Sequence, residues 1–313
     1  MAQVVCVGDL LIDFVPTETG TGLADAPAFV KAPGGAAANV AVGLARLGVP
    51  SAFLGMVGDD PFGHFLADTL RGEGVDTTPL RFTAEARTAL AFVSLRADGE
   101  REFMFYRHPS ADMLMRPDDV VMDVVDSCRV FHYGSITLIN EPARSATLAA
   151  AQRAKAGGKL ISYDPNLRMS LWPSAEAARA GMRLGMTGAD VVKVSEEELE
   201  FLTGQSDPAA LWLDGMTLLV VTRGPNGATL YIPQEQVTMP GFAVNSVDTT
   251  GAGDSFVAAL LGGLLQYGDD FDHHLPEIAR FANAVGAITT TQKGAIPALP
   301  TRAQAEAFLA ANI

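Results

Sequence analysis

Residues 248–254 (DTTGAGD) combine the residue types that phosphate chemistry needs. The apolar run SFVAALLGGLLQY follows and predicts a helix. Gly251 and Gly253 allow backbone conformations that are closed to other residues, so the N–H groups of Gly251, Ala252, Gly253 and Asp254 can point at one place. The dipole of the helix adds partial positive charge there. These features predict an anion hole that suits a phosphoryl group in transfer.

Asp254 stands at the start of this helix and has two interpretations. A first-turn carboxylate can simply stabilise the helix dipole. Alternatively, it is a general base that takes a proton from an alcohol held beside the anion hole. The string is neither a Walker A sequence nor a dinucleotide-binding fingerprint, and the lysine of a Walker A loop is absent.

The elements that must position these residues can be read from hydrophobic patterning. Short apolar runs predict strands, and periodic stretches between them predict helices. The alternation of the two is typical of an α/β fold, with a parallel sheet covered by helices on both faces. The predicted strands are residues 3–7, 52–54, 130–133, 159–163, 191–194 and 217–221, and the first predicted helices are residues 35–47 and 61–73.

Two segments interrupt this alternation. Residues 12–31 are strand-like and end at a Pro-Gly-Gly turn, and residues 88–107 alternate in polarity around an Ala-Asp-Gly turn at 97–99. We expect them to form one small antiparallel sheet that projects from the core and closes over a ligand. A further hairpin is expected at residues 225–227.

The chain is therefore expected to be a single domain over residues 1–313. Its lid would comprise approximately residues 12–33 and 87–108.

Composition narrows the classes of partner and location. The net charge of −14 argues against nucleic acid, which needs clustered Lys and Arg, but backbone amides can still bind a small phosphate. The two cysteines lie in apolar runs and predict neither a disulfide framework nor a Cys-based zinc site. The N-terminus lacks the basic region of a signal peptide, and no apolar stretch is long enough to span a bilayer. We expect a cytoplasmic protein without a membrane partner.

Two segments together indicate a family. DTTGAGDSF resembles the C-terminal signature of the ribokinase/PfkB family of carbohydrate kinases, and GGAAANVAVGLARLG at residues 34–48 resembles its N-terminal signature. The resemblance covers essentially the whole chain. It implies a three-layer α/β/α sandwich with a small β-sheet lid, and it implies ATP and Mg²⁺ as cofactors.

Further segments, among them GDLLIDFVPT, VFHYGSITLI, SYDPNLRMSLWPS and KVSEEELEFLTG, resemble plant-type fructokinases and their bacterial relatives. The implied reaction is the ATP-dependent phosphorylation of D-fructose to fructose 6-phosphate, with Asp254 as the base. The alternatives are a 2-keto-3-deoxygluconate kinase or another sugar kinase of the family. A keto acid would need cations for its carboxylate, which Arg107 and Arg168 could supply. From another class, a catalytically inactive sugar-binding scaffold is disfavoured because Asp254, Gly251 and Gly253 are all present.

The resemblance also implies the residues that contact the sugar. A carboxylate can accept hydrogen bonds from vicinal hydroxyls, paired glycines let a ligand approach the backbone, and an amide both donates and accepts. Each of these residues also has a structural interpretation. The carboxylate could belong to a solvated turn, the paired glycines to a turn that enters a helix, the amide to a solvent-facing position, and the arginines to surface ion pairs. The implied sugar-binding residues are Asp13, Gly34, Gly35, Asn39, Arg107 and Arg168.

A second implied set contacts the nucleotide and the ions. Glu198 would act on Mg²⁺ through water, although Ser195 and Glu198 also form a capping box that needs no metal. Ser195 replaces the asparagine of the family pattern, which puts a direct role for this position in doubt. Asp248 and Thr250, with the backbone near residues 293–295, match a K⁺ site. The implied nucleotide-binding residues are Lys193, Glu198, Thr222, Gly224, Gly227, Gly251, Gly253 and Asn283. A homodimer through the exposed lid sheet is a further expectation.

Overall fold

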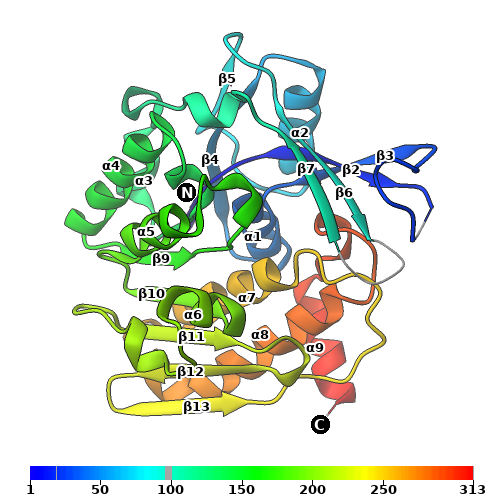
Figure 1. Cartoon of the computed structure of the whole chain (residues 1–313). Helices are drawn as coiled ribbons and strands as arrows, with labels where there is room; N and C mark the ends of the chain where they lie inside the picture. The colour runs from blue at the N-terminus through cyan, green and yellow to red at the C-terminus, as the bar shows by residue number, and fades with distance from the viewer. Residues whose placement is uncertain (19, 96–100, 313) are drawn as a thin grey trace.

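The main sheet runs in the strand order β13-β12-β11-β10-β9-β8-β1-β4-β5 (Figure 1). The structure is a computed structural model that describes residues 1–18, 20–95 and 101–312. Neighbouring strands from β5 to β11 are parallel, whereas β12 and β13 are antiparallel at one edge. The strands are β1 (Val4–Val7), β4 (Ser51–Gly58), β5 (Leu80–Thr83), β8 (Val130–Gly134), β9 (Leu160–Asp164), β10 (Val191–Ser195), β11 (Leu218–Thr222), β12 (Ala228–Ile232) and β13 (Glu235–Met239).

Helices cover both faces of this sheet, which gives three layers. On one face, α1, α7 and α8 pack through residues such as Leu44, Leu260 and Ile278. On the other face, α4, α5 and α6 pack through residues such as Ala150 and Met182. The helices are α1 (Ala36–Arg46), α2 (Pro61–Gly72), α3 (Met122–Ser127), α4 (Ala143–Ala156), α5 (Ala175–Met186), α6 (Glu196–Thr203), α7 (Ala252–Tyr267), α8 (Leu275–Thr289) and α9 (Arg302–Ala311). The predicted three-layer α/β/α sandwich is confirmed.

The central strands are apolar without a break because both of their faces are covered. In β1, Val4 and Cys6 belong to one core cluster, and Val5 and Val7 belong to the other. The side chains of a strand alternate between its faces, so four consecutive apolar residues serve two cores. This pattern explains why the parallel strands could be predicted from short apolar runs.

A second, smaller sheet projects from the main body, in the order β3-β2-β6-β7 (Figure 1). Its strands are β2 (Leu11–Pro16), β3 (Phe29–Gly34), β6 (Ala89–Leu95) and β7 (Arg101–Tyr106). The predicted small sheet is present, but the prediction that it is antiparallel throughout was wrong. Both β2 and β6 begin at the main body, with Leu11 opposite Ala89, so they run outward in parallel, and β3 and β7 pair with them as antiparallel neighbours. The predicted turn at residues 97–99 lies outside the described residues.

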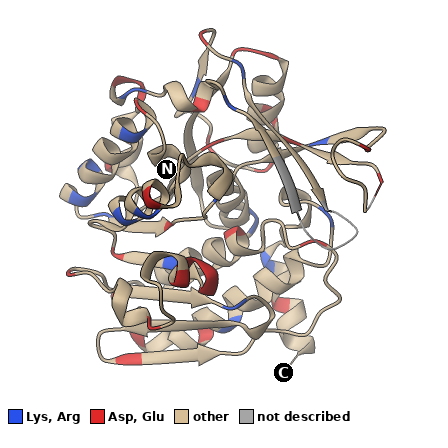
Figure 2. Cartoon of the chain, in the orientation of Figure 1, with Lys and Arg blue, Asp and Glu red and all other residues tan. Residues whose placement is uncertain are grey.

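Charged residues are unevenly distributed over the helices. Figure 2 shows Lys and Arg gathered on α4 and α5, and Asp and Glu gathered at α6. No helix in the described part of the chain combines the length and apolar character that crossing a membrane requires.

Candidate active site

A cavity of about 440 Å³ lies between the small sheet and the carboxyl ends of the central strands. In open α/β sheets, ligands bind at this end of the strands. Eleven of the predicted site residues line the cavity: Asp13, Gly35, Asn39, Arg168, Lys193, Glu198, Asp248, Thr250, Gly251, Gly253 and Asp254. The remaining predicted residues, which do not line it, are Gly34, Arg107, Thr222, Gly224, Gly227, Ala252 and Asn283.

The N-terminus of α7 points into this cavity from the glycine-rich loop. Gly251 caps the helix with a φ of 80°, a backbone conformation that favours glycine. A Cβ atom on Gly251 would lie 2.9 Å from the Cβ of Ala295. The first N–H groups of a helix have no partner within it and can bind an anion. In this loop the N–H of Ala252 donates to the carbonyl of Thr249 at 3.3 Å. The local geometry is therefore suited to the predicted anion hole.

Asp254, in this first turn, is buried and receives two side-chain hydrogen bonds. Asn39 Nδ2 donates to its Oδ2 at 2.7 Å, and Asn166 Nδ2 donates to its Oδ1 at 3.0 Å. Burial raises the pKa of Asp254 to about 6, against the hydrogen bond from Asn39, which lowers it. The group is thus ionised at neutral pH, but close enough to titration to accept a proton, as a general base must. Burial of Asn39 excludes the solvent-facing alternative for that residue.

Asn166 was not among the predicted site residues. It follows β9 in the sequence Asp-Pro-Asn and has a φ of 45°. Its backbone N–H donates to Asp164 Oδ1 at 3.1 Å, and the next N–H, that of Leu167, donates to Glu198 Oε1 at 2.7 Å. The signal that could have found it is an asparagine directly after a strand end and a proline.

Glu198 holds two backbone segments together. Its Oε2 accepts from the N–H of Ser195 at 2.9 Å, and the N–H of Glu198 donates to Ser195 Oγ at 3.2 Å. These two bonds form the predicted capping box at the start of α6. Burial raises the pKa of Glu198, and the nearby Lys193 opposes this effect. Both carboxylate oxygens of Glu198 therefore already have a structural partner, and its action on Mg²⁺ stays a prediction.

Lys193 brings a buried positive charge next to the anion hole. Its Nζ lies 3.2 Å from Asp164 Oδ2, and both side chains are buried. Burial lowers the pKa of Lys193, whereas the neighbouring carboxylates of Asp164 and Glu198 raise it. The carboxylates together outweigh burial, so the pKa of Lys193 is above its usual value. A Cβ atom on Gly253 would lie 3.3 Å from Lys193 Nζ. The ammonium group thus stands beside the first turn of α7, where it can attract phosphate.

Two further carboxylates, those of Asp9 and Asp13, line the cavity. Burial and the adjacent Asp9 raise the pKa of Asp13 to about 7, and burial raises the pKa of Asp9 itself to about 6. A Cβ atom on Gly34 would lie 2.2 Å from Asp13 Oδ2, and one on Gly35 would lie 2.2 Å from the carbonyl oxygen of Asp9. Gly35, with a φ of 115° and the Asp9 backbone this close, therefore has to be glycine, whereas a side chain at residue 34 would displace the Asp13 carboxylate. Sequence reasoning missed Asp9, which stands in the turn just after β1.

The two predicted arginines have different environments. Arg107 is buried in an ion pair with Asp112, also buried, and does not line the cavity. Burial lowers the pKa of Arg107, whereas the carboxylates of Asp112 and Asp9 raise it, and the net shift is upward. Arg168 does line the cavity, and its Nη1 donates to the carbonyl of Leu167 at 3.1 Å. Contact of Arg107 with the sugar stays a prediction.

The predicted nucleotide residues outside the cavity shape the surrounding loops. Thr222 ends β11, and its Oγ1 donates to the carbonyl of Val194 at 3.3 Å. Gly224 and Gly227 have φ angles of 49° and 89° in the turn between β11 and β12. Asn283 on α8 donates to the carbonyls of Met239 and Pro240, at 3.1 Å each. Asn283 thus anchors the chain after β13, and its contact with a nucleotide stays a prediction.

The residues of the predicted K⁺ site are close together. Asp248 Oδ1 accepts from the N–H and the Oγ1 of Thr250, at 2.9 and 2.7 Å, and its Oδ2 accepts from the N–H of Gly294 at 2.9 Å. The carboxylate therefore joins the loop before α7 to the loop before α9. Ion binding there stays a prediction.

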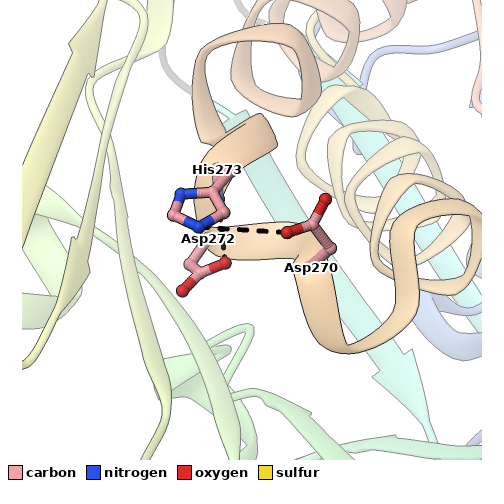
Figure 3. Close-up of side chains that lie close together, drawn as sticks. All are labelled: Asp270, Asp272 and His273. Atoms are coloured by element: carbon pink, nitrogen blue, oxygen red, sulfur yellow. Dashed lines mark hydrogen bonds and ion pairs between the residues drawn. The ribbon is translucent and has the colours of Figure 1, made fainter.

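A different group with the spacing of metal ligands occurs among the described residues. Asp270, Asp272 and His273 lie on the exposed 3₁₀ turn Gly268–His274, with ligand atoms within 4.8 Å of one another (Figure 3). None of the three lines the cavity. We assign no metal to them, because exposed carboxylates gather without metal on many surfaces.

Comparison with known proteins identifies the family. The family model described as "pfkB family carbohydrate kinase" matches residues 1–302. Fructokinase-2 of Solanum lycopersicum is 55% identical over 313 residues, which cover 98% of this chain and 95% of the relative. The solved structure of fructokinase with bound ATP from Xylella fastidiosa has a TM-score of 0.92 and 35% identity, covering 100% of this chain and 99% of that one. Fructokinase from Vibrio cholerae with fructose, ADP and calcium bound has a TM-score of 0.87 and 42% identity, covering 99% of each chain. The chain belongs to the pfkB family of carbohydrate kinases.

Proposed function

We propose that this chain is an ATP-dependent fructokinase that converts D-fructose to fructose 6-phosphate. The observation that carries the proposal is the buried carboxylate of Asp254 beside the N-terminus of α7, within a cavity that the small sheet covers. This arrangement supplies a proton acceptor and an anion hole at one place. Support for fructose comes from the relatives named fructokinases and from the Vibrio cholerae structure with fructose and ADP.

In the proposed reaction, fructose lies against Asp13, Asn39 and Arg168, and the γ-phosphate of ATP lies at the N–H groups of residues 251–254. Asp254 takes the proton of the 6-hydroxyl as that oxygen attacks phosphorus in line. The bond to the β-phosphate oxygen breaks, and ADP leaves. The N–H groups and Lys193 stabilise the charge of the phosphoryl group in transfer. Closure of the small sheet would exclude water and so limit wasteful hydrolysis of ATP.

We propose Mg²⁺ and K⁺ as the ions of this site. Mg²⁺ prefers phosphate oxygens, waters and few carboxylates, and Glu198 and its neighbour Glu197 line the cavity where such waters would lie. Bound Mg²⁺ would neutralise phosphate charge. For K⁺, the carboxylate of Asp248, with Thr250 and the backbone near residue 294, offers oxygen ligands.

The charges in the cavity favour a neutral sugar over a keto acid. Asp9, Asp13 and Asp254 line it, and of the two arginines predicted to contact the sugar only Arg168 does. The positive charge of Arg107 is already matched by Asp112. The carboxylate of 2-keto-3-deoxygluconate would therefore meet more negative than positive charge, whereas fructose hydroxyls can donate to these carboxylates.

A coupled assay of ADP release with fructose, ribose and 2-keto-3-deoxygluconate tests the proposal. We expect kcat/KM to be highest for fructose. A higher kcat/KM for the keto acid would overturn the choice of substrate. Calorimetric binding of sugar without any ADP formation would instead favour the inactive scaffold.

We further propose that residues 1–313 act as one cytoplasmic kinase domain that forms a homodimer through the small sheet. Val30, Met104 and Tyr106 expose 59%, 42% and 54% of their surface on this sheet, and such apolar exposure favours association. Sedimentation equilibrium should give twice the chain mass, and Val30→Lys should shift the protein towards monomer. A wild-type monomer at micromolar concentration would refute the dimer.

A further inference from the structure

The side chain of Asn166 plays no part in the reaction proposed above, yet it contacts the same carboxylate as Asn39. Its Nδ2 donates to Asp254 Oδ1 at 3.0 Å, while Asn39 Nδ2 donates to Oδ2 at 2.7 Å. One amide comes from α1 and the other from the loop after β9, so the carboxylate is held from two elements. We propose that Asn166 is a positioning residue that, together with Asn39, fixes the orientation of the Asp254 carboxylate. This inference rests on the proposed role of Asp254 as the base.

The backbone of Asn166 adopts an unfavourable conformation that places its side-chain amide next to Asp254. A φ of 45° is unfavourable for residues with a side chain, and asparagine is among those that tolerate it best. The loop is tied on both sides, because the N–H of Asn166 donates to Asp164 and the N–H of Leu167 donates to Glu198. Asp164 is in turn paired with Lys193. These contacts hold the loop in a conformation that brings the amide to Asp254.

The chemistry of a carboxylate explains what this pair of amides can do. An ionised carboxylate only accepts hydrogen bonds, and each of its oxygens can accept more than one. An amide on each oxygen therefore fixes the plane of the group and still leaves a lone pair for the hydroxyl proton of the sugar. Hydrogen bonds to the charged form also favour that form. Burial acts in the opposite direction and raises the pKa of Asp254 to about 6. Without the amide of Asn166, the pKa should rise further.

Two variants distinguish the effect of the side-chain amide from that of the backbone conformation at residue 166. Asn166→Gly removes the donor and accepts the positive φ, whereas Asn166→Asp keeps the size and replaces the donor with a second carboxylate. For Asn166→Gly we expect the acidic limb of kcat/KM for fructose to move up by about one pH unit, as expected for a lost hydrogen bond to a charged group. Asn166→Asp should move it further, because a second carboxylate beside Asp254 disfavours the charged form of both. We also expect kcat to fall at least about tenfold, the lower end of the effect of misplacing a reacting group. Asn140→Gly, in the turn before α4 and away from the cavity lining, is the matched control and should keep the wild-type profile.

A second readout does not depend on turnover. The carboxyl ¹³C resonance of Asp254, assigned by its loss in Asp254→Asn, is titrated in the ligand-free protein. The midpoint should be higher in Asn166→Gly than in wild type. An unchanged midpoint and an unchanged acidic limb in both variants would overturn the positioning role, even if kcat fell. If the wild-type protein phosphorylated no sugar, the proposed function would fail, and the titration would still decide whether Asn166 acts on Asp254.

Discussion

Asp254→Asn should lower kcat for fructose by about 10²–10⁴-fold, the usual contribution of a general base. The substitution preserves the volume of a side chain that is 6% exposed, so the surrounding packing should change little. An amide can still accept a hydrogen bond from the sugar, but it cannot take the proton, so we expect the effect to fall on kcat more than on KM. Steady-state ADP release at saturating fructose and ATP measures it.

A matched control for this substitution is Asp214→Asn, because Asp214 is exposed and does not line the cavity. It should retain the wild-type kcat. In the wild-type enzyme, kcat/KM should fall as the pH drops below about 6, because Asp254 takes up a proton there and can no longer act as a base. Nearly unchanged turnover in Asp254→Asn would exclude proton transfer to this residue.

The parts of the site that were predictable from sequence are those with a local cause. The start of α7 at residues 251–254 depends on two glycines and the apolar run that follows, and all of these are visible in one segment. The strand ends are likewise local, so polar residues just after β1 and β9 could be expected to face a cavity. Arg168, after β9, was predicted in this way and does line it, whereas Asp9, just after β1, was missed. Asp13 was predicted as the end of the first strand region; it lies within β2 and also lines the cavity.

The parts that could not be predicted depend on which side chains the fold brings into contact. Asn39 was predicted in the cavity, but its hydrogen bond to Asp254, which lies 215 residues further along the chain, has no local signal. Arg107 follows an apolar strand and appeared free to reach a sugar, yet Asp112, five residues later, pairs with it inside the protein. Spacing along a chain shows where charges occur, but not which of them are already neutralised.

In the sheets, too, features with a local sequence signal could be predicted and features without one could not. Apolar runs located most of the parallel strands, because burial on both faces leaves a signal in each strand alone. The pairing of β2 with β6 joins residues that are about 80 positions apart in sequence, and only the common starting edge of the two strands makes it parallel. The strands β5 and β13 were missed, because they are short edge strands with exposed residues.

Lys193→Met should lower the free energy of unfolding by about 3–5 kcal/mol, the cost of leaving one partner of a buried ion pair uncompensated. Asp164 would stay buried after losing the ammonium group 3.2 Å away. Methionine retains the length and the apolar stem of lysine, so lost packing should contribute little. Urea denaturation monitored by circular dichroism gives the difference in unfolding free energy, provided that the slopes with urea concentration agree.

The double variant Lys193→Met/Asp164→Asn tests whether the loss of stability comes from the unpaired charge or from the change in side-chain shape. Removing both charges leaves no unpaired ion, so the double variant should be more stable than Lys193→Met alone, although the amide must still accept the N–H of Asn166. Kinase activity should not recover with stability, since Lys193 is proposed to act on the phosphate. A single variant as stable as wild type would show that the buried pair does not hold the site together. Recovery of both stability and activity in the double variant would instead limit Lys193 to neutralising Asp164.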